Sequence, residues 1–235
     1  MLGFIVALES ETPNLLESLT NVQKHKINGF NVYTFNVLKA YVTIVYSGVG
    51  KANAAAATQL LIDHFKIKTV INIGTCGGIS KKINAGDIVV PQTLSYYDVD
   101  VTAFGYTLQQ IPHMPTEYMV DQALFNKIES IIRSLQKKCV IGKIATGETF
   151  ITQKSSSKFM TVIKSFDVVD MEACAIAQVC NRNGCSYAFI KIVSDTIHHK
   201  DVNEKQWNTN VANYGKNINE LIINVSHFLV YEQQK

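Results

Sequence analysis

The chain has 235 residues, of which 47% are hydrophobic and 17% are charged, and its net charge at pH 7 is +3. This composition is typical of a globular protein and excludes a disordered chain. The charge is too small and too scattered to indicate a nucleic-acid-binding protein. Every apolar run is shorter than the roughly 20 residues of a membrane-spanning helix, so we expect no membrane partner. The length suits one large α/β domain or two small ones, and we expect a single domain over residues 1–235.

The first apolar run, Leu2–Leu8, predicts a strand that is buried on both faces. It lacks the basic start and the small-residue cleavage site of a signal peptide, so we expect none. The five cysteines are odd in number and form no CxxC pair. We therefore expect neither a zinc site nor a disulfide framework, and we place the protein in a reducing compartment, the cytoplasm.

Glu11 lies in the short connection that follows this strand. Thr12-Pro13 has the residue types of a helix N-cap and first helical position, which predicts a helix as far as Leu19. Glu11 then lies between a strand and a helix, and ligands of open α/β sheets bind beyond the carboxyl ends of strands. Glu11 is thus a candidate site residue, although an exposed loop acid would fit the same position.

The remaining elements follow from the spacing of apolar residues. Continuous or alternating apolar stretches predict strands over 31–38, 41–46, 69–73, 87–91, 139–145, 168–169 and 186–193. Helical patterns predict helices over 52–65, 117–135, 155–161 and 173–179, and a final helix that begins at Trp207. The strands over 31–38 and 41–46 alternate apolar and polar residues, which suits an antiparallel pair.

A glycine-rich segment, Ser47–Lys51, precedes the first of these helices. A nucleotide-triphosphate loop would need glycine at position 45 and Ser or Thr at position 52, where the chain has Val45 and Ala52. We reject such a site. We expect the glycines to let the backbone approach a ligand or a neighbouring strand.

Two further segments have an unusual composition. Gly74–Gly78 predicts a turn whose backbone amides can line a small-molecule pocket, or a turn that simply packs tightly. The stretch from Tyr96 to Tyr106 is rich in aromatic residues, and Pro112 closes it. Exposed aromatic side chains in a loop indicate a hydrophobic pocket or a partner surface.

Two carboxylates, Asp170 and Glu172, lie between the strand over 168–169 and the helix over 173–179. Acidic residues in the first turn stabilise a helix through its dipole, which is the simpler interpretation. This helix is apolar on nearly every side, however, and such a helix is buried. A carboxylate at its start then needs hydrogen-bonding partners, and the junction becomes a candidate site.

Lys191 shares one face of the last core strand with Phe189 and Val193. A buried lysine is costly unless a carboxylate meets it, and Glu11 and Glu172 are the natural candidates. His198 and His199 are adjacent on a polar stretch without an evident third ligand, so we expect no metal there.

The chain resembles a known family over almost its whole length. The matching segments, in order and with similar spacing, are Gly3–Glu11, Ser47–Lys51, Gly74–Gly78, Asp98–Tyr106, Thr149–Ile151, Val169–Ala173 and Val193–Asp195. They are similar to those of the 5′-methylthioadenosine/S-adenosylhomocysteine nucleosidases, within the nucleoside phosphorylase superfamily. The glycine segment is shared across the superfamily, whereas Glu11, Met171-Glu172, Ser194-Asp195 and Val101–Tyr106 are more specific to the nucleosidases.

The resemblance implies a three-layer α/β fold in which helices flank a twisted mixed sheet. It also implies a homodimer, no metal and no organic cofactor. The implied reaction is hydrolysis of the bond between adenine and the ribosyl thioether, a step of methionine salvage and of the recycling of S-adenosylmethionine by-products.

The resemblance also assigns residue roles. Glu11 matches the base that activates water, Glu172 the carboxylate that binds the ribose hydroxyls, and Asp195 the acid that serves adenine N7. Phe150 and Ile151 match the adenine-binding pair, and Met171 matches a residue against the ribose. Leu8, Val101, Phe104, Tyr106 and Pro112 correspond to the pocket for the 5′-alkylthio group, and Gly77 and Ser194 are further substrate-binding candidates. Part of the alkylthio pocket comes from the partner subunit in the family.

The chemistry itself calls for these residue types. Departure of adenine leaves a ribosyl cation-like centre, as in glycoside hydrolysis, and a partly buried Asp with a raised pKa can protonate the leaving base. A carboxylate near the ribose favours the developing positive charge, and another acid can take a proton from water on the opposite face. Three acids at three strand ends fit this division of labour better than they fit a metal site.

The chain departs from the family pattern at three places. Lys191 stands where the family commonly has Arg, and it lacks the planar two-pronged donor. Thr146-Gly147-Glu148 replaces Ser-Gly-Asp, and Asp170 replaces a longer acid. The change at Lys191 puts the positioning of Glu11 or its water in question, whereas the other two changes alter only the reach of a side chain.

Three other functions remain open from the residues alone. A phosphorylase of the same superfamily would need a cationic clamp for phosphate, and the two arginines, Arg133 and Arg182, lie away from the glycine segments. A nucleoside-binding protein without catalysis would not need all three acids. A hydrolase of another nucleoside differs only in the residues around the 5′ group.

Overall fold

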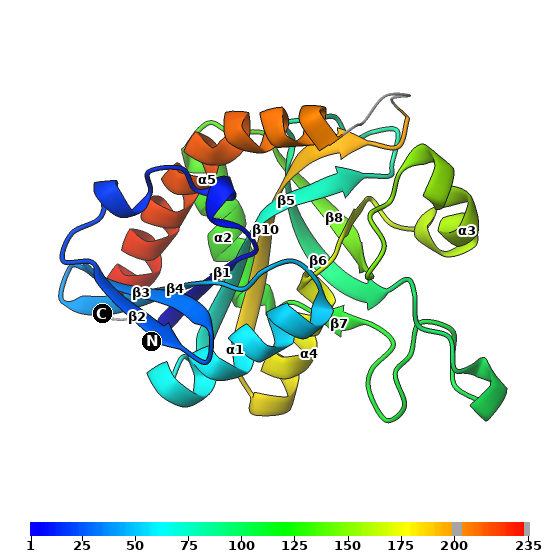
Figure 1. Cartoon of the computed structure of the whole chain (residues 1–235), viewed down its shortest axis with the longest axis horizontal. Helices are drawn as coiled ribbons and strands as arrows, with labels where there is room; N and C mark the ends of the chain where they lie inside the picture. The colour runs from blue at the N-terminus through cyan, green and yellow to red at the C-terminus, as the bar shows by residue number, and fades with distance from the viewer. Residues whose placement is uncertain (199–203, 233–235) are drawn as a thin grey trace.

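The computed structural model describes residues 1–198 and 204–232, and every strand predicted from the sequence is present in it (Figure 1). The strands are β1 (Leu2–Val6), β2 (Gln23–Ile27), β3 (Phe30–Val37), β4 (Ala40–Tyr46), β5 (Thr69–Gly78), β6 (Ile88–Tyr96), β7 (Tyr118–Met119), β8 (Cys139–Thr146), β9 (Val168–Asp170) and β10 (Ser186–Thr196). The α-helices are α1 (Lys51–Phe65), α2 (Gln122–Ser134), α3 (Gln153–Ile163), α4 (Ala173–Asn183) and α5 (Glu204–Glu232).

Within the described residues the ten strands form one mixed sheet, ordered β10-β6-β8-β9-β5-β1-β4-β3-β2 with β7 beside β6. β10 pairs with β5 as well as with β6, so this part of the sheet closes on itself. β1, β5 and β10 run parallel, and their carboxyl ends therefore lie at one edge, where side chains beyond the strands can meet. The predicted α/β fold, a mixed sheet flanked by helices, is confirmed.

The helices cover the sheet because their apolar residues recur at helical spacing. In α2, five such residues are buried: Leu124, Phe125, Ile128, Ile131 and Ile132. α1 packs against α4, and α5 packs against α2 and β10. Figure 1 shows α3 and the loop between β6 and β7 standing out from this body. No helix of the described chain combines the length and the apolar run needed to cross a membrane.

The helix predicted from Thr12 to Leu19 is wrong. The chain forms two single 3₁₀ turns there, Glu9–Glu11 and Leu16–Ser18. The Thr12 side chain does not cap a helix, because its hydroxyl bonds the hydroxyl of Tyr46 at 2.7 Å. Asn14 has a left-handed φ of 58°, which interrupts any helix at this point.

The turn predicted at Gly74–Gly78 is also wrong, since β5 continues through all five residues. β10 pairs with this segment from Gly74 to Gly78 and supplies the backbone partners that keep it extended. The glycines nevertheless leave room for side chains: a Cβ at Gly74 would lie 2.9 Å from Glu11 Oε1. Strands β2 and β7 and the exact helix ends were not predicted.

Candidate active site

A cavity of about 390 Å³ opens at the carboxyl ends of β1, β5 and β10. The β8–α3 loop and the β9–α4 junction complete its wall. Its lining is mostly apolar, with a few converging polar groups, as in a small-molecule site. The lining residues are Ala7, Leu8, Glu11, Val49, Asn72, Ile73, Gly74, Thr75, Cys76, Gly77, Thr149, Phe150, Ile151, Thr152, Val169, Asp170, Met171, Glu172, Lys191, Ser194 and Asp195.

Glu11 is buried, with 3% of its surface exposed. Its Oε1 accepts from the amide and the hydroxyl of Thr75, at 2.7 and 2.9 Å, and its Oε2 accepts from the amide of Leu8 at 3.1 Å. Three hydrogen bonds compensate the burial of this carboxylate and fix its orientation. The loop-acid alternative is therefore wrong, because Glu11 faces the cavity rather than solvent.

Lys191 is 1% exposed, and its ammonium contacts Asp170 Oδ2 at 2.9 Å. The prediction that Glu11 or Glu172 is its direct partner is wrong, because those carboxylates are held by backbone amides elsewhere. Burial alone would lower the pKa of Lys191, but the charges of Asp170 and Glu172 and the bond to Asp170 raise it above its ordinary value. Lys191 thus stays charged, and two of the three departures from the family pattern, Lys191 and Asp170, meet in one ion pair.

Both carboxylate oxygens of Asp170 are bound by neighbouring protein groups. Its Oδ1 accepts from the Thr146 hydroxyl at 2.6 Å, and its Oδ2 accepts from the Ala173 amide at 3.0 Å, besides its contact with Lys191. The bond from Ala173, the first residue of α4, ties Asp170 to the start of this helix. Asp170 therefore has little capacity left to act on a ligand.

Glu172 faces the cavity from the start of α4 and is 6% exposed. Its Oε1 accepts from the Gly50 amide, which precedes α1, at 3.0 Å. Burial and then the negative charge of Asp170 raise the pKa of Glu172 to about 7, against the opposing effects of Lys191 and the Gly50 amide. The candidate at the strand–helix junction is thus Glu172 and not Asp170.

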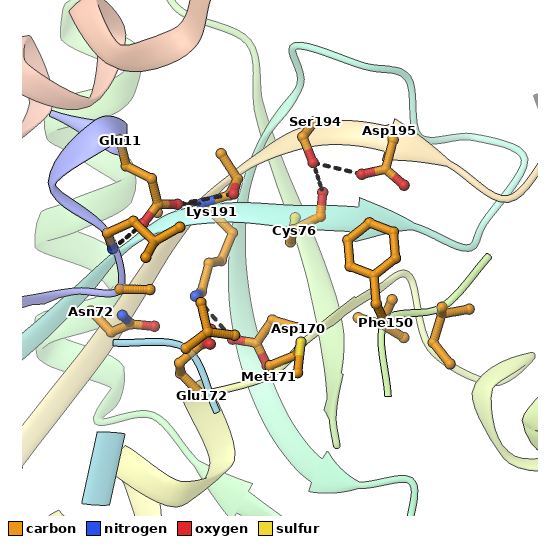
Figure 2. A pocket seen from close by; sticks show the side chains of 18 of the residues that line it. Glu11, Asn72, Cys76, Phe150, Asp170, Met171, Glu172, Lys191, Ser194 and Asp195 are labelled. Atoms are coloured by element: carbon orange, nitrogen blue, oxygen red, sulfur yellow. Dashed lines mark hydrogen bonds and ion pairs between the residues drawn. The ribbon is translucent and has the colours of Figure 1, made fainter. Parts of the chain in front are cut away.

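Asp195 lies near the end of β10, paired in register with Gly77 of β5. Ser194 Oγ lies 2.6 Å from Asp195 Oδ1 and 3.2 Å from the Cys76 carbonyl, and it can donate to either. Burial raises the pKa of Asp195, and the Ser194 hydroxyl partly opposes this. In Figure 2, Asp195 and Phe150 lie toward one end of the cavity and Glu11 and Glu172 toward the other.

The structure brings together most of the side chains that the resemblance named. Besides the three acids, the cavity is lined by Leu8, Gly77, Phe150, Ile151, Met171 and Ser194. Four residues of the expected alkylthio pocket are not among the lining residues of this single chain: Val101, Phe104, Tyr106 and Pro112. They lie in the loop between β6 and β7, where Phe104 is 81% exposed.

The sequence analysis did not single out the side chains of Asn72 and Thr75, which both line the cavity. Thr75 holds Glu11, as described above. Asn72 is 1% exposed; its Nδ2 donates to the Ile5 carbonyl at 2.9 Å, and its Oδ1 has no hydrogen-bond partner among the described residues. An amide in the middle of an apolar strand is a signal that could have identified it.

Among the described residues, no three His, Cys, Asp or Glu side chains gather to hold a metal ion. The Nε2–H group of His198 donates a hydrogen bond to the Ile79 carbonyl at 2.9 Å. His199 lies outside the described residues, as does the side chain of Trp207.

Comparison with known proteins decides the family. Residues 1–226 match the phosphorylase superfamily. A 5′-methylthioadenosine/S-adenosylhomocysteine nucleosidase of Staphylococcus haemolyticus is 34% identical over 96% of this chain and 100% of its own length. The chain belongs to this nucleosidase family. A second nucleosidase, of Listeria monocytogenes, is 36% identical over 85% of this chain and 88% of its own length.

Solved nucleosidases share the fold. The Streptococcus pyogenes S-adenosylhomocysteine nucleosidase, in complex with 5-methylthiotubericidin, superposes with a TM-score of 0.88 at 29% identity and covers 97% of this chain and 96% of its own. The Colwellia psychrerythraea nucleosidase, in complex with adenine, superposes with a TM-score of 0.86 at 33% identity, over 95% and 93% of the two chains. The fold thus belongs to a family in which one of these solved members holds 5-methylthiotubericidin and the other holds adenine.

Proposed function

We propose that this chain hydrolyses the N-glycosidic bond of 5′-methylthioadenosine and S-adenosylhomocysteine and releases adenine. Three buried carboxylates on one small apolar cavity carry the proposal. The cationic residue among the described lining residues, Lys191, is already paired with Asp170, and Arg133 pairs with Glu129 on the surface. A phosphate clamp therefore has little support, which favours water over phosphate as the nucleophile.

In the proposed reaction, Asp195 donates a proton to adenine as the glycosidic bond breaks. Adenine packs on Phe150 and Ile151, at the same end of the cavity as Asp195. Glu172 accepts from the ribose hydroxyls and favours the positive charge that develops on the sugar. Glu11, held by Thr75 and Leu8, takes the proton of the attacking water on the opposite face. Each acid has a different environment, which suits three different roles.

The direct test is adenine release from the two thioether nucleosides in phosphate-free buffer, with inosine alongside. Release without phosphate is the expected result and would establish a hydrolase. A strict requirement for phosphate would instead make the chain a phosphorylase. If no adenine is released with or without phosphate, the chain is a nucleoside-binding protein or an enzyme that acts on a different nucleoside.

The pH dependence should follow Glu172. Because its pKa is raised to about 7, it gains a proton as the pH falls through this value and can no longer accept from both ribose hydroxyls. We expect kcat/KM to fall by roughly tenfold for each unit below this pKa. A pH profile of kcat/KM measures this fall on the acid side, which we call the acid limb. Glu172→Gln should lower the rate and abolish the acid limb. An unchanged kcat/KM in Glu172→Gln would remove the residue from this role.

We further propose a homodimer in which the β6–β7 loop of one copy completes the cavity of the other. Large apolar side chains are exposed on and beside this loop, with Phe104 81%, Leu108 40% and Met119 61% exposed. Phe104, Val101, Tyr106 and Pro112 would then contact the 5′-alkylthio group across the interface.

Phe104→Asp should turn the dimer into a monomer, because a charge is costly in an apolar interface. Sedimentation velocity measures the mass of the protein in solution. The ratio of kcat/KM for methylthioadenosine over adenosine measures the preference for the 5′-alkylthio group. Lys39→Asp, a charge change at an exposed turn far from the loop in sequence, serves as control. A Phe104→Asp protein that keeps the wild-type mass and substrate ratio would contradict the proposed interface.

We also propose that the chain functions as one nucleosidase domain in the cytoplasm. All five cysteines are free, which supports a reducing compartment. Burial raises the pKa of Cys76 and Cys174, so these thiols are poor nucleophiles and act as small apolar side chains.

A further inference from the structure

Three charged residues form a closed ring outside the cavity lining. Lys51 begins α1, Asp98 follows β6, and Glu148 lies in the β8–α3 loop. Lys51 Nζ donates to both carboxylate oxygens of Asp98, at 2.9 and 2.8 Å. The Glu148 amide donates to Asp98 Oδ2 at 2.9 Å, and the Lys51 amide donates to Glu148 Oε1 at 2.8 Å. Each of the three residues therefore contacts both of the others.

This ring reaches Glu172 through a single residue. Gly50, the residue before Lys51, donates its amide to Glu172 Oε1 at 3.0 Å. Two consecutive amides at the start of α1 thus hold two carboxylates, Glu172 from the cavity and Glu148 from outside. Gly50 has a φ of +101°, and a Cβ there would lie 2.8 Å from Glu148 Oε2, so only glycine lets both acids approach.

The ring also reaches the adenine end of the cavity. Glu148 stands two residues before Phe150, and the residue between them, Thr149, is held from both sides by Tyr97: the Thr149 amide donates to the Tyr97 hydroxyl, which donates in turn to the Thr149 carbonyl. Gly147 packs so tightly on the Tyr97 ring that an added Cβ would overlap it. Tyr97 and Asp98 together therefore fix the course of this loop.

We propose that Lys51, Asp98 and Glu148 are positioning residues, which hold the start of α1, and with it the amide that binds Glu172, against the loop that carries Phe150. None of the three lines the cavity, so they act through Gly50 and the loop. The inference rests on the nucleosidase function proposed above and deepens it. It also gives a role to the departure at Glu148, whose carboxylate reaches the α1 amide from another element.

The ring should influence the protonation of Glu172. The groups that face Glu172 are Asp170 from β9, Lys191 from β10, Glu11 from the segment after β1, and the Gly50 amide before α1. Of these, Lys191 and the Gly50 amide lower the pKa of Glu172. A looser start of α1 weakens the Gly50 bond and raises this pKa, so the acid limb of kcat/KM moves to higher pH.

The test is Lys51→Met, with Asp98→Asn as a second variant that breaks the same contact. We expect kcat/KM for methylthioadenosine to fall about fivefold at neutral pH, the size of effect of a partly buried, charge-assisted contact. We expect the acid limb to move upward by roughly half a unit, since one hydrogen bond to a carboxylate is weakened. Lys51→Arg keeps the charge and should restore most of both properties.

The chain offers a control with the same type of two-oxygen contact. Lys138 Nζ also contacts both oxygens of one carboxylate, those of Asp87, at 2.8 and 2.8 Å, and neither residue lines the cavity. Lys138→Met should leave the acid limb in place. An active wild-type protein whose Lys51→Met and Asp98→Asn variants keep the wild-type limb and kcat/KM would overturn this inference alone. A wild-type protein that releases no adenine under any condition would remove the proposed function and this inference together.

Discussion

Asp195→Asn should lower kcat by roughly 10²- to 10⁴-fold, the usual contribution of a general acid. Asp195 is 6% exposed, and its burial raises the pKa of the carboxyl group. A raised pKa keeps the proton available closer to neutral pH, where the leaving adenine needs it. Asparagine has the same shape and can still accept from Ser194, but its amide cannot donate a proton to the base in the same way.

Single-turnover release of adenine measures the rate of this chemical step. Calorimetric titration with adenine measures the affinity of the cavity for adenine. Adenine should still bind to Asp195→Asn within a few-fold of wild type, because Phe150, Ile151 and the rest of the lining are unchanged. Ser194→Ala is the matched comparison: it removes the hydroxyl bond at 2.6 Å but leaves the acid, so its loss of kcat should be far smaller. A near wild-type rate for Asp195→Asn would exclude Asp195 as the acid.

The strands were predictable because each carries its signal locally. Leu2–Val6 is buried at every position, and the apolar run shows this without any knowledge of its neighbours. The segment after Glu11 was not predictable in the same way. Its Thr12 hydroxyl bonds Tyr46, which lies 34 positions away, and this contact competes with the helix cap that the local residues suggest. The extension of β5 through Gly78 likewise depends on pairing with β10.

The candidate site shows the same division between local and distant causes. Glu11 was recognised because it closely follows a buried strand, Glu172 because it precedes a buried helix, and Asp195 through the resemblance to the family. Their partners were not predicted, since the amides of Thr75 and Gly50 come from elements far along the chain. The pairing of Lys191 with Asp170 was not predicted for the same reason. The distant amides bind Glu11 and Glu172, and this leaves Asp170 as the carboxylate that pairs with Lys191.

Lys191→Met should lower both stability and activity, because it leaves the Asp170 carboxylate buried without its cation. The two side chains are 2% and 1% exposed, and breaking such a pair from one side costs about 3–5 kcal/mol. For a chain of this size the loss corresponds to a fall in Tm of roughly 10 °C. Differential scanning calorimetry measures it, and Lys138→Met, whose lysine pairs at the surface, should change Tm far less.

The activity of Lys191→Met separates a structural from an electrostatic role. Lys191 lowers the pKa of Glu172, so its loss leaves Glu172 more protonated at neutral pH and should reduce kcat/KM by more than tenfold there. The double variant Lys191→Met with Asp170→Asn removes both charges and should recover part of the lost Tm. It also removes the raising effect of Asp170 on Glu172, so the acid limb should return toward its wild-type position. If the double variant recovers Tm but its acid limb stays where it is in Lys191→Met, the ion pair contributes to stability alone. If Tm and the acid limb both return toward wild type, the net charge of the Lys191–Asp170 pair sets the protonation of Glu172.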